Sequence, residues 1–274
     1  MDKIKKKRNE RIGALIKILS DQPNSVVTLN YFCDIFSAAK SSISEDIVIA
    51  KKLLEDLKLG TIHTITGALG GVKYIPLVNK DKAIEFLQDI CTQLEGEDRI
   101  IPGGFIYMTD IIYSPDKAVK IGEILGTQFI HKEIDYVITM ETKGIPIALM
   151  TAKALGVTLV IIRKDSKVTE GSTVSINYVS GSSNRIQTMS LSRRAIRNGS
   201  KVLIIDDFMK AGGTAKGMMD LMKEFDCKVE GIGVLVATRE PENKVVDRYV
   251  PLLNLEKVDI ENKKAYITPN LHLI

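Results

Sequence analysis

Apolar and polar positions alternate at helical spacing at the beginning of the chain. Between Ile12 and Leu19 the apolar residues fall at i, i+3, i+4 and i+7, the stripe of an amphipathic helix, which is expected to end at Pro23. A short helix is predicted from about Thr28 to Ser37. Ser42 and Glu45 have the spacing of a capping box, so a third helix is expected to begin at Ser42.

The third predicted helix is followed by strand patterns. Its inward stripe comprises Ile43, Ile47, Ala50, Leu54 and Leu57. Two strand-like segments, Thr61–Thr66 and Val72–Pro76, come next, separated by the glycine-rich stretch 67–71. Three short helices and a hairpin predict a winged helix over residues 1–79. A helical domain that dimerises without contacting DNA is the alternative.

Residues 80–274 alternate between strand and helix patterns. Helices are predicted at 81–94, from Pro115, at 145–155 and at 216–225; strands are predicted at 105–109, 134–140, 158–163, 202–206, 229–237 and in the tail from Val246. This βαβ order predicts an α/β fold with a parallel-sheet core and helices on both faces. The predicted organisation is therefore two domains, 1–79 and 80–274.

Composition narrows the class of protein. Hydrophobic residues make up 45% and charged residues 26%, as in soluble globular proteins. No apolar run approaches the ~18 residues of a membrane span, and no apolar stretch follows the basic N-terminus as in a secretory signal. Cys33, Cys91 and Cys227 are widely separated, which favours reduced thiols and a cytoplasmic protein without membrane contact.

The positive charge of the chain is confined to its first segment. Residues 1–79 contain 12 Lys and Arg against 8 Asp and Glu, whereas residues 80–274 contain 26 of each. A small basic domain joined to a neutral one is typical of proteins that bind nucleic acid. The residues expected to meet double-stranded DNA are Lys5, Lys6, Lys7, Arg8, Lys40, Ser41, Ser42, Ser44, Lys51, Gly70, Gly71 and Lys73.

The stretch from Val202 to Thr214 carries the strongest chemical signal. A branched apolar run ends in Asp206 and Asp207, and a loop containing Gly212 and Gly213 precedes a helical pattern. Carboxylates at the carboxyl end of a buried strand can accept hydroxyl groups, and glycine N–H groups before a helix can bind phosphate. The sequence therefore predicts a site for a ribose 5-phosphate. An ordinary strand–turn–helix with two solvated acids is the alternative.

This stretch resembles the phosphoribosyl pyrophosphate (PRPP) motif of type I phosphoribosyltransferases. In that family, the loop at the position of Glu141–Pro146 binds pyrophosphate. The polar segment 163–185 corresponds to a mobile loop that covers PRPP. A solvated β-hairpin is the alternative interpretation of segment 163–185. One departure is Lys210-Ala211, where the family's enzymes often have Ala-Thr. A phosphate-binding hydroxyl is lost and a cation is gained, which favours binding without catalysis.

Four stretches resemble the purine operon repressors of Gram-positive bacteria: 39–46, 70–76, 168–178 and 206–214. The resemblance covers both domains. It implies a dimeric repressor of purine synthesis and salvage genes, with PRPP and Mg²⁺ as inducer and guanosine tetraphosphate as competitor. Phe105 stands where that family usually has a base-stacking Tyr. The implied effector-binding residues are Thr142, Lys143, Gly144, Arg163, Lys164, Phe105, Tyr107, Asp206, Asp207, Phe208, Lys210, Ala211, Gly212, Gly213 and Thr214.

Two other classes of function stay open. The chain could be an active purine phosphoribosyltransferase with an accessory N-terminal domain, or a scaffold whose first domain only dimerises. Lys210-Ala211 and the uneven distribution of charge weigh against both. On the repressor interpretation no catalytic residue and no resident metal is expected.

Overall fold

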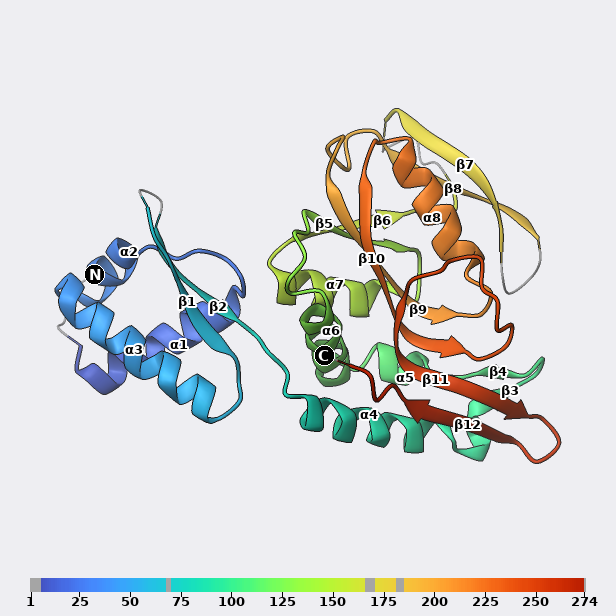
Figure 1. The fold of residues 1–274 in the computed structure, drawn as a ribbon, viewed down its shortest axis with the longest axis horizontal. Coiled ribbons are helices and arrows are strands. Elements are labelled where there is room, and N and C mark those ends of the chain that lie inside the picture. The colour runs from blue at the N-terminus through green and yellow to red at the C-terminus, as the bar shows by residue number, and fades with distance from the viewer. Residues whose placement is uncertain (1–5, 68–69, 166–170, 181–184, 274) are drawn as a thin grey trace. The chain divides into compact units, whose positions relative to one another are not determined.

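The structure is a computed structural model that describes residues 6–67, 70–165, 171–180 and 185–273. The chain forms two compact units: the first comprises residues 1–79 and the short stretch Lys153–Gly156, and the second comprises residues 80–152 and 157–274 (Figure 1). Within the described ranges, none of the helices combines the length and apolarity that crossing a bilayer requires.

Three helices and a two-stranded hairpin make up the first unit. They are α1 (Arg8–Asp21), α2 (Leu29–Phe36), α3 (Lys40–Asp56), β1 (Thr61–Ile65) and β2 (Gly71–Ile75). The two strands are antiparallel. The apolar stripes of the helices meet in one core with the hairpin, which includes Leu15, Phe32, Ile43 and Ile62. This arrangement confirms the predicted winged helix.

Helix α3 begins before the predicted capping box. Its N-cap is Ala39, which makes no side-chain hydrogen bond, and the hydroxyl of Ser44 donates to the carbonyl oxygen of Lys40. The prediction that the helix starts at Ser42 is therefore wrong, because the chain turns into the helix directly after α2. Leu57, predicted to face inward, is 53% exposed because it follows the last helical residue.

A buried ion pair joins α1 to α3. Arg11 donates from Nε to Asp46 Oδ2 at 2.6 Å and from Nη2 to Asp46 Oδ1 at 3.2 Å, and the Asp46 side chain is fully buried. Arg8 reaches the same carboxylate at 3.5 Å and the exposed Glu45 at 2.6 Å. Because a buried charge without its partner is strongly unfavourable, this two-pronged pair fixes how α3 lies on α1.

A six-stranded mixed sheet forms the centre of the second unit. Its order is β12-β11-β10-β9-β5-β6, with all neighbours parallel except the antiparallel pair β11 and β12. The strands are β5 (Tyr136–Met140), β6 (Thr158–Ile162), β9 (Lys201–Met209), β10 (Lys228–Thr238), β11 (Val250–Asp259) and β12 (Lys264–Pro269). The helices are α4 (Lys80–Leu94), α5 (Thr109–Ile112), α6 (Pro115–Gln128), α7 (Ile145–Leu155) and α8 (Gly213–Lys223). The predicted α/β fold is confirmed.

Strand β9 is buried on both faces, as its continuous apolar run predicted. Val202 and Ile204 belong to the same core cluster as Met218 of α8. On the other face α6 approaches so closely that a Cβ at Gly231 of the neighbouring strand β10 would lie 2.4 Å from Phe129. Side chains alternate along a strand, so the two acids that follow leave β9 toward opposite faces.

Two small hairpins flank the sheet. β3 (Ile100–Ile101) pairs with β4 (Phe105–Ile106), so the predicted strand 105–109 is too long: the chain has turned into α5 by Thr109. β7 (Thr173–Val179) pairs with β8 (Ile186–Ser192) and packs on α8. The polar segment predicted as a loop or hairpin is thus a hairpin in its described part, and residues 166–170 and 181–184 lie outside that part.

Replacing Asp46 with Ala should destabilise the first unit by about 3–5 kcal/mol, because Arg11 would keep its charge in the core without a partner. Hydrogen exchange of the α1 and α3 amides would measure the loss. Glu45→Ala is the matched control: its carboxylate is exposed, and its removal should cost less than about 1 kcal/mol. Equal effects of the two variants would contradict a structural role for the buried pair.

Candidate functional site

Strand β9 loses one neighbour before it ends. β5 pairs with β9 as far as Ile138 opposite Ile204, whereas β10 stays paired as far as Met209. The sheet grows from β5 toward β6 and from β9 toward β10, so the strand order reverses between β5 and β9. The crevice at such a reversal is where open α/β sheets bind ligands.

Asp206 and Asp207 lie in this crevice, within the strand. The strand was predicted to end at Asp206, but hydrogen bonding to β10 extends it to Met209 and leaves a short loop before α8. Both acids are therefore held by sheet backbone on one side and face an opening on the other.

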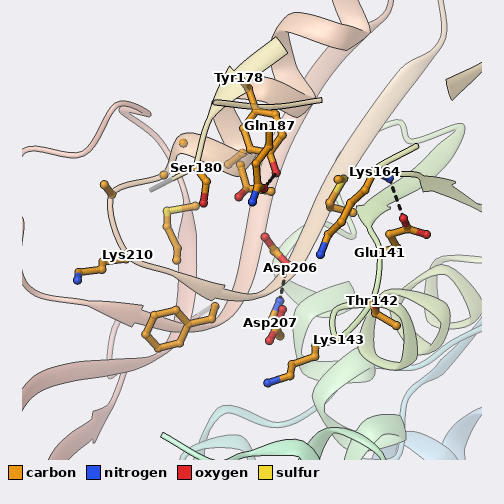
Figure 2. Close-up of a pocket in the computed structure, with 18 residues that line it drawn as sticks. Glu141, Thr142, Lys143, Lys164, Tyr178, Ser180, Gln187, Asp206, Asp207 and Lys210 are labelled. Atoms are coloured by element: carbon orange, nitrogen blue, oxygen red, sulfur yellow. Dashed lines mark hydrogen bonds between the residues drawn. The ribbon is translucent and has the colours of Figure 1, made fainter. Parts of the chain in front are cut away.

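A pocket of about 450 Å³ occupies the crevice (Figure 2). The loop after β5, the end of β6, the β7–β8 hairpin and the β9–α8 loop all contribute to it. Its lining residues are Met140, Glu141, Thr142, Lys143, Lys164, Tyr178, Ser180, Gln187, Asp206, Asp207, Phe208, Met209, Lys210, Ala211, Gly212, Gly213, Thr214 and Ala215. The predicted ribose, phosphate and pyrophosphate segments thus converge on one pocket.

Burial raises the pKa of both acids at the centre of the pocket. The pKa of Asp206 is held well above its ordinary value by desolvation and then by the neighbouring charge of Asp207. Desolvation also raises the pKa of Asp207, although Lys143 opposes the shift. The backbone N–H of Asp207 donates to Asp206 Oδ1 at 2.9 Å. Ionisation of both carboxylates for a ligand therefore works against this desolvation.

Three lysines line the pocket but point in different directions. Figure 2 shows the amine of Lys164 directed toward Asp206 and the side chain of Lys143 running beside Asp207, whereas Lys210 points away from both acids. Lys143 was predicted to meet pyrophosphate, and its position beside Asp207 gives the pocket a positive wall there. An anion would fit between these amines and the loop.

Glu141 ties the ends of β5 and β6 together. Its carboxylate accepts the backbone N–H of Lys164 at 2.7 Å and a guanidinium N–H of Arg163 at 3.2 Å. These bonds lower the pKa of Glu141 despite its burial. Arg163, predicted to bind effector, is instead engaged with Glu141 and does not line the pocket.

Glycines let the loops approach closely. A Cβ at Gly144 would lie 2.7 Å from the hydroxyl of Thr139 and 3.1 Å from Asp206 Oδ1, so only glycine allows the loop after β5 to sit against β9. Gly144 itself does not line the pocket. Gly212 has a φ of 85° and caps the N-terminus of α8, a conformation that other residues rarely adopt.

The β7–β8 hairpin contributes two residues, Tyr178 and Gln187, that were not among the predicted effector-binding residues, although the segment 163–185 was expected to cover the ligand. Tyr178 donates its hydroxyl to Gln187 Oε1 at 2.8 Å, and both residues face the pocket (Figure 2). Burial raises the pKa of Tyr178, a hydrogen bond with Thr214 opposes the rise, and Asp206 adds to it. The pairing of Tyr178 with Gln187 depends on the register of the hairpin, which no local pattern in the sequence specifies.

A second, more apolar pocket of about 400 Å³ adjoins the first. It shares Lys143, Asp207, Phe208 and Lys210 with the first pocket. Its other lining residues are Ile101, Gly103, Gly104, Phe105, Ile106, Met108, Thr238, Glu240, Leu255, Glu256, Lys257 and Val258. Phe105 therefore faces this second pocket, whereas Tyr107 lines neither and donates its N–H to the carbonyl of Arg99.

The exposed surface of the first unit carries most of the residues predicted to contact DNA. Lys6, Lys7, Lys40, Ser41, Ser44 and Lys51 are exposed, and Ser42 and Lys73 are half-buried. Lys5 lies outside the described residues. The exposed cations and hydroxyls at the start of α3 form a surface suited to a phosphate backbone.

Arg8, Gly70 and Gly71, which were predicted to contact DNA, also have structural roles. Arg8 pairs with Glu45 and Asp46. A Cβ at Gly71 would lie 2.3 Å from the carbonyl oxygen of Val27, and one at Gly70 would lie 2.7 Å from two carbonyl oxygens in the hairpin turn. Close backbone packing alone is therefore enough to require these glycines.

Family models match both units of the chain. A model described as the N-terminal domain of the bacterial purine repressor matches residues 7–76, and a phosphoribosyl transferase domain matches residues 116–267. The chain is 49% identical to the purine biosynthesis transcriptional repressor of Bacillus subtilis over 96% of its own length and 93% of that protein. It is 42% identical to the purine biosynthesis transcriptional activator of Lactococcus lactis over 94% and 95% of the two chains.

The second unit also resembles solved enzymes. The adenine phosphoribosyltransferase of Rhodothermus marinus superposes with a TM-score of 0.53 at 25% identity, covering 64% of this chain and 99% of the enzyme. The predicted type I phosphoribosyltransferase fold is thereby confirmed.

Replacing Asp206 with Asn should stabilise the folded protein at neutral pH. A carboxyl whose pKa is raised by folding costs stability as the pH rises above its ordinary pKa of 3.8, and Asn removes that cost while still accepting the N–H of Asp207. We expect a gain on the order of 1 kcal/mol at pH 8, shrinking as the pH falls toward 4. Urea unfolding at both pH values measures it.

Asp220→Asn serves as the opposite control. Hydrogen bonds from Lys223 and Lys216 lower the pKa of Asp220 in spite of desolvation, so its ionised form stabilises the fold. The control should lose stability at pH 8. An Asp206→Asn variant that also loses stability there would contradict the desolvation argument.

Proposed function

The chain belongs to the family of bacterial purine repressors, and on that premise we propose that it represses purine biosynthesis and salvage genes by binding operator DNA. PRPP acts as inducer by weakening this binding. The observation that carries the proposal is the presence, in one chain, of a winged helix with an exposed basic surface and a ribose-phosphate pocket built on Asp206 and Asp207.

The pocket offers a separate partner for each part of PRPP. Asp206 and Asp207 accept the two ribose hydroxyls, and the loop 211–214 at the N-terminus of α8 holds the 5-phosphate. The loop 142–144 and Lys164 hold the pyrophosphate, together with Mg²⁺. Hydrogen-bond acceptors thus face the hydroxyls, and N–H donors and positive charge face the phosphates.

The second pocket suits a purine base. Phe105 and Phe208 both line it, and aromatic faces of this kind stack on bases. Since it opens beside Asp207 and Lys143, a nucleotide could place its base there and its phosphates in the first pocket. This supports guanosine tetraphosphate as a competitor of PRPP.

The loop after β9 favours binding over catalysis. Lys210-Ala211 replaces the hydroxyl-bearing loop frequent in type I phosphoribosyltransferases, although the backbone N–H groups remain. The alternative function is an active purine phosphoribosyltransferase. Incubation with PRPP and each purine base, followed by chromatography for nucleotide and pyrophosphate, distinguishes the two: we expect no product.

Repression is the proposed sign of the response. The relative from Bacillus subtilis is named a repressor and the one from Lactococcus lactis an activator, and the higher identity is to the repressor. Transcription in vitro from a purine promoter should therefore fall when the protein is added and recover with PRPP. A rise in transcription would assign an activator.

A homodimer is the proposed binding form. Helix-turn-helix proteins commonly read two-fold operators as dimers, because each recognition helix contacts one half-site. Light scattering on the free protein and on its DNA complex would give the stoichiometry.

The first experiment is binding to a purine promoter fragment by fluorescence anisotropy at fixed salt, with PRPP and Mg²⁺ titrated in. Specific binding that PRPP weakens supports both halves of the proposal. Specific binding that PRPP leaves unchanged keeps the regulator but requires another effector. Absence of specific binding would favour the alternative function, an active purine phosphoribosyltransferase.

Asp206→Asn should lose the response to PRPP while keeping its affinity for DNA. The amide cannot accept both hydroxyl bonds as a carboxylate does, and the exposed surface of the first unit is untouched. The same anisotropy titration checks this. Because the variant is expected to be more stable than the parent protein, loss of response cannot be ascribed to unfolding; a normal response would remove Asp206 from the effector site.

Lys40→Ala should weaken DNA binding across specific and unrelated sequences alike. Loss of one phosphate contact reduces the slope of log affinity against log salt by about 1. PRPP affinity should not change. Lys17→Ala, an exposed lysine of α1 that pairs with Asp21, is the control and should leave the slope as it is. An unchanged slope for Lys40→Ala would place the DNA elsewhere.

A further inference from the structure

The loop 241–246, between β10 and β11, packs behind the phosphate loop of the pocket. Lys244 Nζ donates to the carbonyl oxygen of Lys210 at 2.7 Å and to that of Pro241 at 3.0 Å. The backbone N–H of Val245 donates to the carbonyl oxygen of Ala211 at 3.0 Å. None of the residues 241–246 lines the ribose-phosphate pocket, so these contacts come from outside it.

The two captured carbonyls determine where the next N–H groups point. In a trans peptide the C=O and N–H point in opposite directions. The carbonyl of Lys210 belongs to the same peptide unit as the N–H of Ala211, and the carbonyl of Ala211 to the same unit as the N–H of Gly212. Since loop 241–246 holds both carbonyls and lies outside the pocket lining, the two N–H groups point away from this loop.

We propose that Lys244 is a positioning residue for anion binding: from behind the loop, it and the N–H of Val245 aim the N–H donors of Ala211 and Gly212 at a phosphate. This deepens the proposed function and rests on it for the identity of the ligand. A phosphomonoester such as ribose 5-phosphate is the class of ligand that these donors take.

The surroundings of Lys244 fit this role. The side chain is half-buried, and desolvation lowers its pKa while Glu240 opposes the shift. An ammonium bound to a carbonyl also polarises that peptide, which strengthens its N–H as a donor. Gly212 completes the contact, since a Cβ there would lie 3.0 Å from Val246.

The test is calorimetric titration of the full-length protein with ribose 5-phosphate and, separately, with pyrophosphate. Lys244→Met keeps the apolar stem and removes the donor, and we expect ribose 5-phosphate to bind roughly tenfold more weakly. Pyrophosphate, held by the loop 142–144, should bind as before. Lys244→Arg retains charge and donors and should recover most of the affinity, whereas Lys132→Met, at an exposed lysine outside both pockets, should match the parent.

Val245→Pro removes the second bond and covers the case in which Lys244→Met does not fold. The Val245 side chain is 57% exposed, so the change leaves the core alone, and it should also weaken ribose 5-phosphate selectively. Unchanged affinity in either folded variant overturns the proposal, and so does a parallel loss of both ligands. If the variants weaken ribose 5-phosphate binding as expected but PRPP does not alter DNA binding, the proposed function is wrong, whereas the positioning role of Lys244 is supported.

Discussion

Two adjacent carboxylates within a buried strand, Asp206 and Asp207, are the constraint on which the second unit depends. Burial in the sheet raises the pKa of both Asp206 and Asp207, and the charge of Asp207 raises that of Asp206 further, so the two acids oppose folding at neutral pH. The sheet tolerates them because β10 continues to hold the strand after β5 has diverged. The divergence of β5 from β9 also opens the crevice beside Asp206 and Asp207, and a ligand can enter there.

The surrounding charges follow from this placement. Lys143 and Lys164 lie in the segments that follow β5 and β6, and Glu141 fixes the backbone of Lys164 by accepting its N–H. A pocket with acids at its centre and amines at its wall distinguishes between the parts of a sugar phosphate: hydroxyls are favoured at the acids, and phosphates are favoured at the amines and the loop. A pocket of this kind would distinguish a sugar phosphate from a simple anion by the spacing of these groups, since charge alone would attract both.

Local pattern was enough to predict most elements, and it failed where contacts distant in sequence decide the structure. The buried run 202–206, the helix 145–155 and the glycine loop each carry their own signal, and the structure places them accordingly. The true end of β9 could not be read from the sequence, because its last residues are apolar or acidic and only pairing with β10 makes them strand. The same holds for Tyr178 and Gln187, which meet through hairpin register, and for Lys244, which lies in no recognisable motif.

The contacts of loop 241–246 with the backbone of Lys210 and Ala211 bear on the departure from the family motif at these two positions. A side-chain hydroxyl at position 211 would add one donor to the phosphate site, but the N–H groups of the loop are backbone and do not depend on that side chain. If Lys244 and Val245 aim them, binding survives the loss of the hydroxyl, whereas chemistry that needs the transition state held more tightly than the ground state does not. A phosphate-binding loop supported in this way can bind its ligand without taking part in catalysis.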